Sequence, residues 1–90
     1  MSLHESLVGK WEKPGGGGTM EFFADGALTM IGESEQMAGR WNVIAADRVK
    51  LHASAFGIES ITTLDAIAIK GDEMAATCEG ERLQLIRAKE

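Results

Sequence analysis

Hydrophobic and polar residues alternate along most of the chain from Thr19 onward, and this is the pattern of β-strands that bury one face. Short turn sequences rich in Gly and Asp separate the alternating stretches. The chain holds eleven glycines and a single proline, a balance that suits short strands and tight turns better than helices. The pattern therefore predicts an all-β fold with about eight short strands in an antiparallel up-and-down meander.

The first turn, Ala24-Asp25-Gly26, can be tested for the pairing that it imposes on its neighbours. A three-residue loop with Gly26 in the left-handed conformation places Phe22 opposite Leu28, so that apolar side chains meet. A two-residue Asp25-Gly26 turn would instead place Phe22 opposite Thr29 and mix polar with apolar positions. We therefore expect the three-residue loop.

The last two turns, Gly71-Asp72 and Glu79-Gly80, agree with each other about the inner face. The first places Ile69 opposite Met74, and the second places Met74 opposite Leu85. Both assign Met74 to the interior, and such agreement between independent turns supports a sheet that closes, or nearly closes, around an apolar core.

The stretch from Ile61 to Lys70 also reads as a strand, but its alternation is broken. Leu64 is out of phase with Ile67, so a regular strand would turn Asp65 inward. We expect a β-bulge near Asp65 or a later start of the strand. The alternative is a buried carboxylate with a raised pKa, suited to general acid–base chemistry but without a partner residue.

Three segments lack the strand pattern and are expected to be loops: Pro14 to Gly18, Gly32 to Glu35, and Ala53 to Ser60 with its one bulky side chain, Phe56. A single helical turn from Leu3 to Leu7 would place its two leucines on one side, where they could cover an open end of the sheet.

Length and composition narrow the class of protein. Ninety residues, 44% of them hydrophobic, suit one globular domain spanning residues 1–90. The formal charge of −5 disfavours binding to nucleic acid. No apolar run reaches the ~18–20 residues of a membrane span, and the first residues lack the features of a signal peptide. The cellular location is not determined by these features.

Candidate chemistry is sparse. The run Gly15–Gly18 leads into a strand and lacks the following Lys of a phosphate-binding loop. His4 and His52 have no metal-ligand spacing, and we expect His52 to be on the surface. Cys78 lies beside the acidic turn Glu79-Gly80-Glu81, which raises a thiol pKa and lowers its reactivity. We predict no catalytic residue, no metal and no cofactor, and therefore not an enzyme.

Several short motifs together resemble the small lipocalin-like domains common in bacteria: Leu7-Val8-Gly9-Lys10-Trp11, the Phe22–Gly26 hairpin, Gly39-Arg40-Trp41, Lys70-Gly71-Asp72 and the closing Leu85-Ile86-Arg87. The resemblance implies a small β-barrel. It also implies that Trp11 lies at the closed end of the barrel with Arg87 across its ring, a cation–π contact with a structural purpose.

Two functions fit such a domain. The leading hypothesis is a non-catalytic module whose partner is a second copy or another protein, because a short meander leaves a strand edge unpaired. An outward-facing Phe23 would add apolar surface. The alternative is a carrier of a small apolar ligand, bound at the open end by Met30, Met37 and Phe56. A cavity of at least ~300 Å³ favours the carrier, and a packed interior favours the association module.

Overall fold

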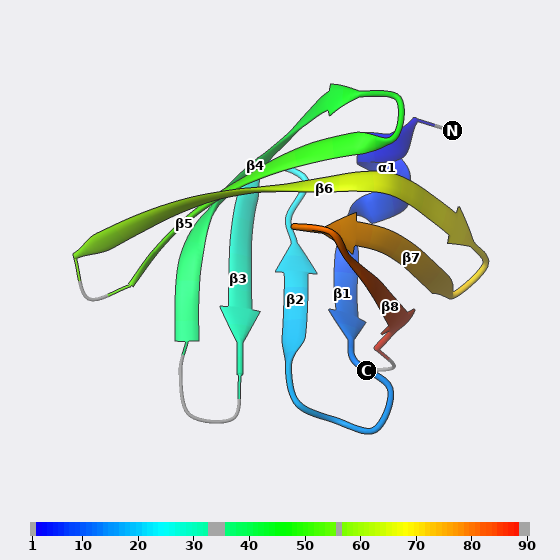
Figure 1. The fold of residues 1–90 in the computed structure, drawn as a ribbon, viewed down its shortest axis with the longest axis horizontal. Coiled ribbons are helices and arrows are strands. Elements are labelled where there is room, and N and C mark those ends of the chain that lie inside the picture. Colours follow the sequence, from blue (N-terminus) through cyan, green and yellow to red (C-terminus); the bar gives the residue numbers. More distant parts are fainter. Residues whose placement is uncertain (1, 33–35, 56, 89–90) are drawn as a thin grey trace.

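The computed structural model describes residues 2–32, 36–55 and 57–88. Within them the chain forms one short helix followed by eight strands, each antiparallel to the next, and β8 pairs with β1 to close a barrel (Figure 1). The elements are α1 (Leu3–Leu7), β1 (Gly9–Glu12), β2 (Thr19–Phe22), β3 (Ala27–Ile31), β4 (Gln36–Ala45), β5 (Arg48–Ala55), β6 (Ile58–Lys70), β7 (Glu73–Cys78) and β8 (Glu81–Arg87). The predicted all-β meander is confirmed.

The first hairpin adopts the three-residue loop expected from the sequence. Phe22 lies opposite Leu28, and the N–H of Phe23 donates to the carbonyl oxygen of Ala27 at 3.0 Å. Gly26 has a φ of +95°, which is the left-handed conformation that this loop requires. Phe23 points outward and is 38% exposed, as the register demands.

The last two hairpins also have the predicted registers. Ile69 lies opposite Met74, and Met74 lies opposite Leu85. Gly71 has a φ of +61°, while Glu79 and Gly80 have φ values of +51° and +84°. Two successive positive φ values are the signature of a type I′ turn, whose twist matches the strands that it joins.

A β-bulge interrupts β6, as the broken alternation predicts. The register between β6 and β7 shifts between Asp65 and Ala68, and Ala66 has a φ of +50°. The extra residue brings Leu64 and Ile67 onto the inner face together, where both are buried. Asp65 therefore stays outside and accepts a hydrogen bond of 2.7 Å from Arg48.

The expectation of a loop from Ala53 to Ser60 is wrong. β5 continues to Ala55, β6 begins at Ile58, and these two residues pair with each other. Small residues are tolerated in β5 because β4 pairs along its other edge as far as Ser54. The extended hairpin reaches away from the rest of the barrel at the left of Figure 1. We call residues 48–64 the β5–β6 ribbon.

The other two expected loops have different outcomes. Pro14 to Gly18 lies in the connection between β1 and β2, where the N–H of Lys13 donates to the carbonyl oxygen of Gly18 at 3.1 Å. Most of the segment from Gly32 to Glu35 lies outside the described residues.

One cluster of buried apolar side chains forms the core of the barrel. Leu7 and Trp11 have no exposed surface, and Phe22 and Leu28 are 1% exposed. The helical turn expected over Leu3–Leu7 is present as α1, with the Ser2 hydroxyl accepting a hydrogen bond from the N–H of Glu5 as its N-cap. Leu3 packs against the same core. The helix thus packs its two leucines against the core at one end of the barrel, which we call the helix end.

Candidate functional site

A cavity of about 400 Å³ lies at the other end of the barrel, bordered by the β1–β2 connection. We call this the cavity end. Its floor consists of buried leucines, Leu51, Leu64 and Leu85, each at most 4% exposed. The walls include the half-buried side chains of Met20 and Met30. An apolar space with a buried floor can hold a small molecule away from water.

The rim of the cavity is exposed and more polar. Gly17, Ile31 and Ser60 line it and are accessible to solvent. Lys13 is also there, and it is the one Lys, Arg, Asp or Glu among the described lining residues. A cation at the mouth of an apolar space is placed to meet an anionic group at the end of an apolar ligand.

Two of the three residues predicted to contact a ligand lie at this cavity. Met30 and Met37 both line the cavity, and they lie opposite each other in the β3–β4 pairing. Phe56 lies outside the described residues. The β1–β2 connection contributes Gly17 and Gly18 to the lining.

Sequence reasoning missed Met20, Lys13 and Thr62 as lining residues. Met20 could have been found, because the alternation in its strand places its side chain on the inner face, opposite Met30. No pattern in the sequence marked Lys13, because it follows the last residue of β1 in an irregular segment.

Cys78 also lines the cavity, at the end of β7. Burial raises the pKa of its thiol, and the nearby carboxylates of Glu79 and Glu81 raise the pKa further. The side chain is therefore a protonated, weakly polar group at neutral pH. It adds to the apolar lining and is a poor nucleophile.

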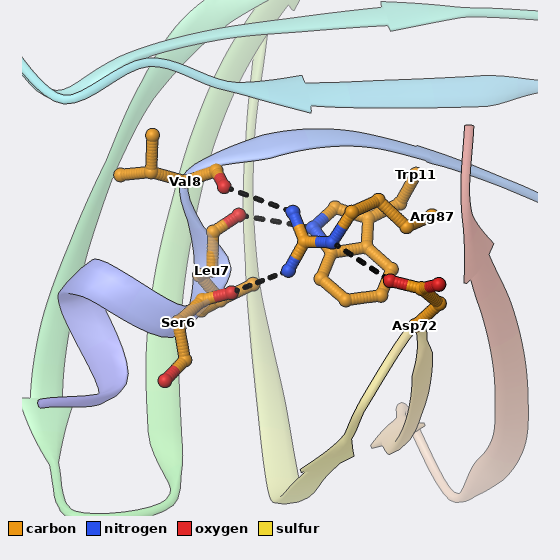
Figure 2. Close-up of polar contacts among 6 residues, drawn as sticks. All are labelled: Ser6, Leu7, Val8, Trp11, Asp72 and Arg87. Atoms are coloured by element: carbon orange, nitrogen blue, oxygen red, sulfur yellow. Dashed lines mark hydrogen bonds and ion pairs between the residues drawn. The ribbon is translucent and has the colours of Figure 1, made fainter. Parts of the chain in front are cut away.

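The helix end is organised around Trp11 and Arg87, which the resemblance named as partners (Figure 2). The guanidinium carbon of Arg87 lies 4.3 Å from the centroid of the Trp11 ring. The two Nη atoms donate to backbone carbonyl oxygens of Ser6 and Val8, each at 3.1 Å. The Nε atom lies 3.7 Å from a carboxylate oxygen of Asp72. The side chain therefore joins the C-terminal end of α1 and the residue after it to the last strand.

Trp11 is fixed in the same cluster. Its Nε1–H donates to the carbonyl oxygen of Leu7 at 2.9 Å, so the buried indole carries no unsatisfied polar group. The cluster also explains the glycine two residues before Trp11, because a Cβ at Gly9 would collide with the Arg87 guanidinium. Glycine at this position leaves the room that the stacked arginine needs.

The remaining candidates do not assemble into a reactive site. His4 stacks on Trp41 with ring centroids 4.7 Å apart, and His52 is exposed beside Glu59. Among residues 2–32, 36–55 and 57–88, no three His, Cys, Asp or Glu side chains gather as a metal site requires. Across the same residues, no helix is both long and apolar enough to cross a bilayer.

Comparison with protein-family models, with curated proteins and with solved structures found no match to the chain.

Proposed function

We propose that this protein is a non-catalytic carrier that binds a small, predominantly apolar molecule in the cavity. The observation behind the proposal is the volume of about 400 Å³ above a floor of buried leucines. It exceeds the ~300 Å³ at which small-molecule sites begin, and ~150 Å³ is enough for benzene in an apolar protein cavity. The likeness to lipocalin-like domains supports the proposal by analogy.

Methionines suit such a site chemically. Met20, Met30 and Met37 are unbranched and polarisable, so they can adjust to apolar ligands of different shapes. The expected ligand is therefore defined by size and polarity more than by a fixed pattern of hydrogen bonds.

Lys13 adds a preference for an anionic end group. The ammonium group is exposed at the rim, so its attraction for a carboxylate is modest, about 0.5–1 kcal/mol or two- to five-fold in affinity. We infer a ligand class of short amphiphiles with an apolar body and a carboxylate, which would leave its charge at the mouth.

Titration with the neutral fluorescent probe N-phenyl-1-naphthylamine tests the carrier proposal. We expect saturable binding of one probe per chain. Met37→Trp fills part of the cavity and should weaken binding at least ten-fold. Ile44→Trp adds the same ring at an exposed position on β4 and should leave binding unchanged. Absence of saturable binding, or equal binding by Met37→Trp, would refute the proposal.

Competition between decanoate and decanol then tests the ligand class. Lys13→Glu should reduce the affinity for decanoate and leave that for decanol unchanged. Lys50→Glu, on the exposed side of β5, is the matched control for net charge. If both lysine variants lower the decanoate affinity equally, the effect comes from overall charge and not from the rim.

A further inference from the structure

The first half of β6 has an unpaired edge. β6 pairs with β5 from Ile58 to Leu64, whereas β7 begins to pair with its other edge only at Leu64. No strand in the described part of the chain pairs with the outer edge of residues 58–63. This edge is the outer side of β6 in the β5–β6 ribbon, at the left of Figure 1.

The backbone groups on this edge can be identified from the register. The N–H of Trp41 donates to the carbonyl oxygen of Gly26 on the β3 side of β4. Backbone groups alternate sides along a strand, and paired residues in adjoining strands face each other. We applied this alternation to the β4–β5 and β5–β6 registers in turn. It shows that the backbone N–H and C=O groups of Ser60 and Thr62 point toward β5. Three residues therefore direct N–H and C=O groups out of the edge: Glu59, Ile61 and Thr63.

This edge lacks the features that usually block pairing with another chain. Residues 58–63 contain no Lys, Arg or Pro, and they carry one charge, on Glu59. The bulge of β6 lies farther along, beyond Asp65. Two large apolar side chains are exposed here, Ile58 at 69% and Ile61 at 61%. A β-branched, exposed and unpaired segment is a ready template for strand addition.

We infer that two copies of this protein associate by antiparallel pairing of these β6 edges, with the two-fold axis at Ser60. Each Ser60 then lies opposite the Ser60 of the second copy, and each Glu59 lies opposite the second copy's Ile61. The two Glu59–Ile61 pairs supply the intermolecular N–H···O=C bonds. The inference concerns the edge alone and does not require a ligand in the cavity.

Steric and charge considerations select this register. A shift that centres the axis on Ile61 would place the second copy's Ile58 opposite Leu64, where Cys78 of β7 already pairs. A shift the other way would place Glu59 opposite the same residue of the second copy, and like charges directly opposite are unfavourable. Pairing centred on Ser60 places the second copy's Gly57 opposite Thr63, one residue before the β7 pairing begins, and it opposes each Glu59 to an apolar side chain.

A second copy fits better than an unrelated peptide because it adds to the site. Ser60 and Thr62 line the cavity, and in this register the second copy's Ile58 lies opposite Thr62. Each chain would therefore place an exposed isoleucine beside the mouth of the other chain's cavity. The association covers apolar surface on both chains while extending the cavity wall.

Sedimentation equilibrium of the full chain with charge variants tests the pairing. We expect a weak, reversible monomer–dimer equilibrium. Ile61→Glu places two carboxylates opposite each other at both pairs and should raise the dimer dissociation constant about ten-fold. The double variant Ile61→Glu/Glu59→Lys restores opposite charges and should recover dimerisation. Ile44→Glu, at an exposed isoleucine on β4, should have no effect. A monomer at every concentration, or failure of the double variant to recover, would overturn the inference.

Disulfide trapping tests the register itself. In a Cys78→Ser background, S60C should form an intermolecular disulfide on mild oxidation, because directly opposed residues of this pair type have Cα atoms ~4.5 Å apart. S54C lies in the same ribbon, exposed on β5, and would be beyond disulfide reach. Equal trapping of both variants would show non-specific collision and rule out this register. Probe binding by the Ile61→Glu monomer separates this outcome from a failure of the carrier proposal.

Discussion

The two ends of this barrel are built differently. At the helix end, Trp11 is fully buried, its indole N–H is bonded, and Arg87 joins carbonyl oxygens on either side of Leu7. At the cavity end, flexible methionines surround a space of about 400 Å³ beside a connection of consecutive glycines. The difference indicates that close packing at one end stabilises the fold, while the other end leaves an open apolar space.

Substitutions should separate the two ends. If stability comes mainly from the helix end, changes there will lower the free energy of unfolding and leave binding intact in the molecules that remain folded. Changes at the cavity end will weaken ligand binding and leave the free energy of unfolding nearly unchanged.

Trp11→Ala is expected to lower the free energy of unfolding by about 3–5 kcal/mol, because it leaves a large void in a close-packed region. Met37→Ala should lower it by about 1 kcal/mol or less, since this half-buried side chain already borders empty space. Urea denaturation followed by circular dichroism measures both. Equal losses would show that the two ends contribute alike.

Arg87→Met is expected to cost about 2 kcal/mol. The substitution keeps an apolar side chain over the ring but leaves the Ser6 and Val8 carbonyl oxygens without the charged donor. Arg82→Met is the matched control on the same strand, where an exposed arginine makes weaker contacts of 3.3 and 3.5 Å. Its expected cost is below about 0.5 kcal/mol. Comparable losses for the two variants would contradict the assigned role of Arg87.

Much of the fold could be predicted from the sequence because its turns carry local information. Gly26, Gly71 and Gly80 fix loop lengths, and loop length fixes register. The out-of-phase Leu64 likewise pointed to the bulge. By contrast, the strand across Ala53–Ser60 is stabilised by pairing with β4 and β6, which no local pattern of small residues reveals.

The cavity was less predictable than the strands. The alternation of side chains along a strand identifies inward residues such as Met30 and Met37. It does not show whether their side chains contact those from the opposite side of the barrel. The volume left between them depends on how the strands are spaced around the barrel, which is a property of the whole sheet. Lys13 was missed for the same reason, since its place at the rim depends on the path of an irregular connection.

Cys78 offers a pH-dependent probe of the cavity end. Because its pKa is raised on folding, the folded chain holds the thiol proton more tightly than the unfolded chain does. The contribution of this group to stability is therefore lost as pH rises past the ordinary thiol value of 9.0. Iodoacetamide should alkylate the folded protein slowly near neutral pH and faster in alkali, and bound N-phenyl-1-naphthylamine should slow the reaction.

The controls for Cys78 are simple. Cys78→Ser should show a flatter dependence of stability on pH above the ordinary thiol pKa. If the folded protein reacts as fast as the urea-unfolded chain, the thiol is neither buried nor shielded by ligand, and its place in the cavity lining is wrong.

Glu79→Asn is expected to produce the smallest effect, a gain of about 0.5 kcal/mol. Glu79 has a φ of +51° in a type I′ turn, a conformation that asparagine adopts with less strain. The turn lies outside the closely packed helix end, so the gain should leave the difference between Trp11→Ala and Met37→Ala unchanged. A loss of stability in urea denaturation would show that the Glu79 side chain has a favourable role.

The hydrogen bonds of Arg87 to Val8 and Ser6 join positions 79 and 81 residues apart. Contacts this distant in sequence cannot form during synthesis until the last strand has left the ribosome, so the nascent chain must wait with its first residues unprotected. Closure of the ring should then be a late, comparatively slow event in folding, on the millisecond-to-second scale of proteins rich in non-local contacts. Protection of residues 6–8 from proteases should therefore appear only once β8 has paired with β1.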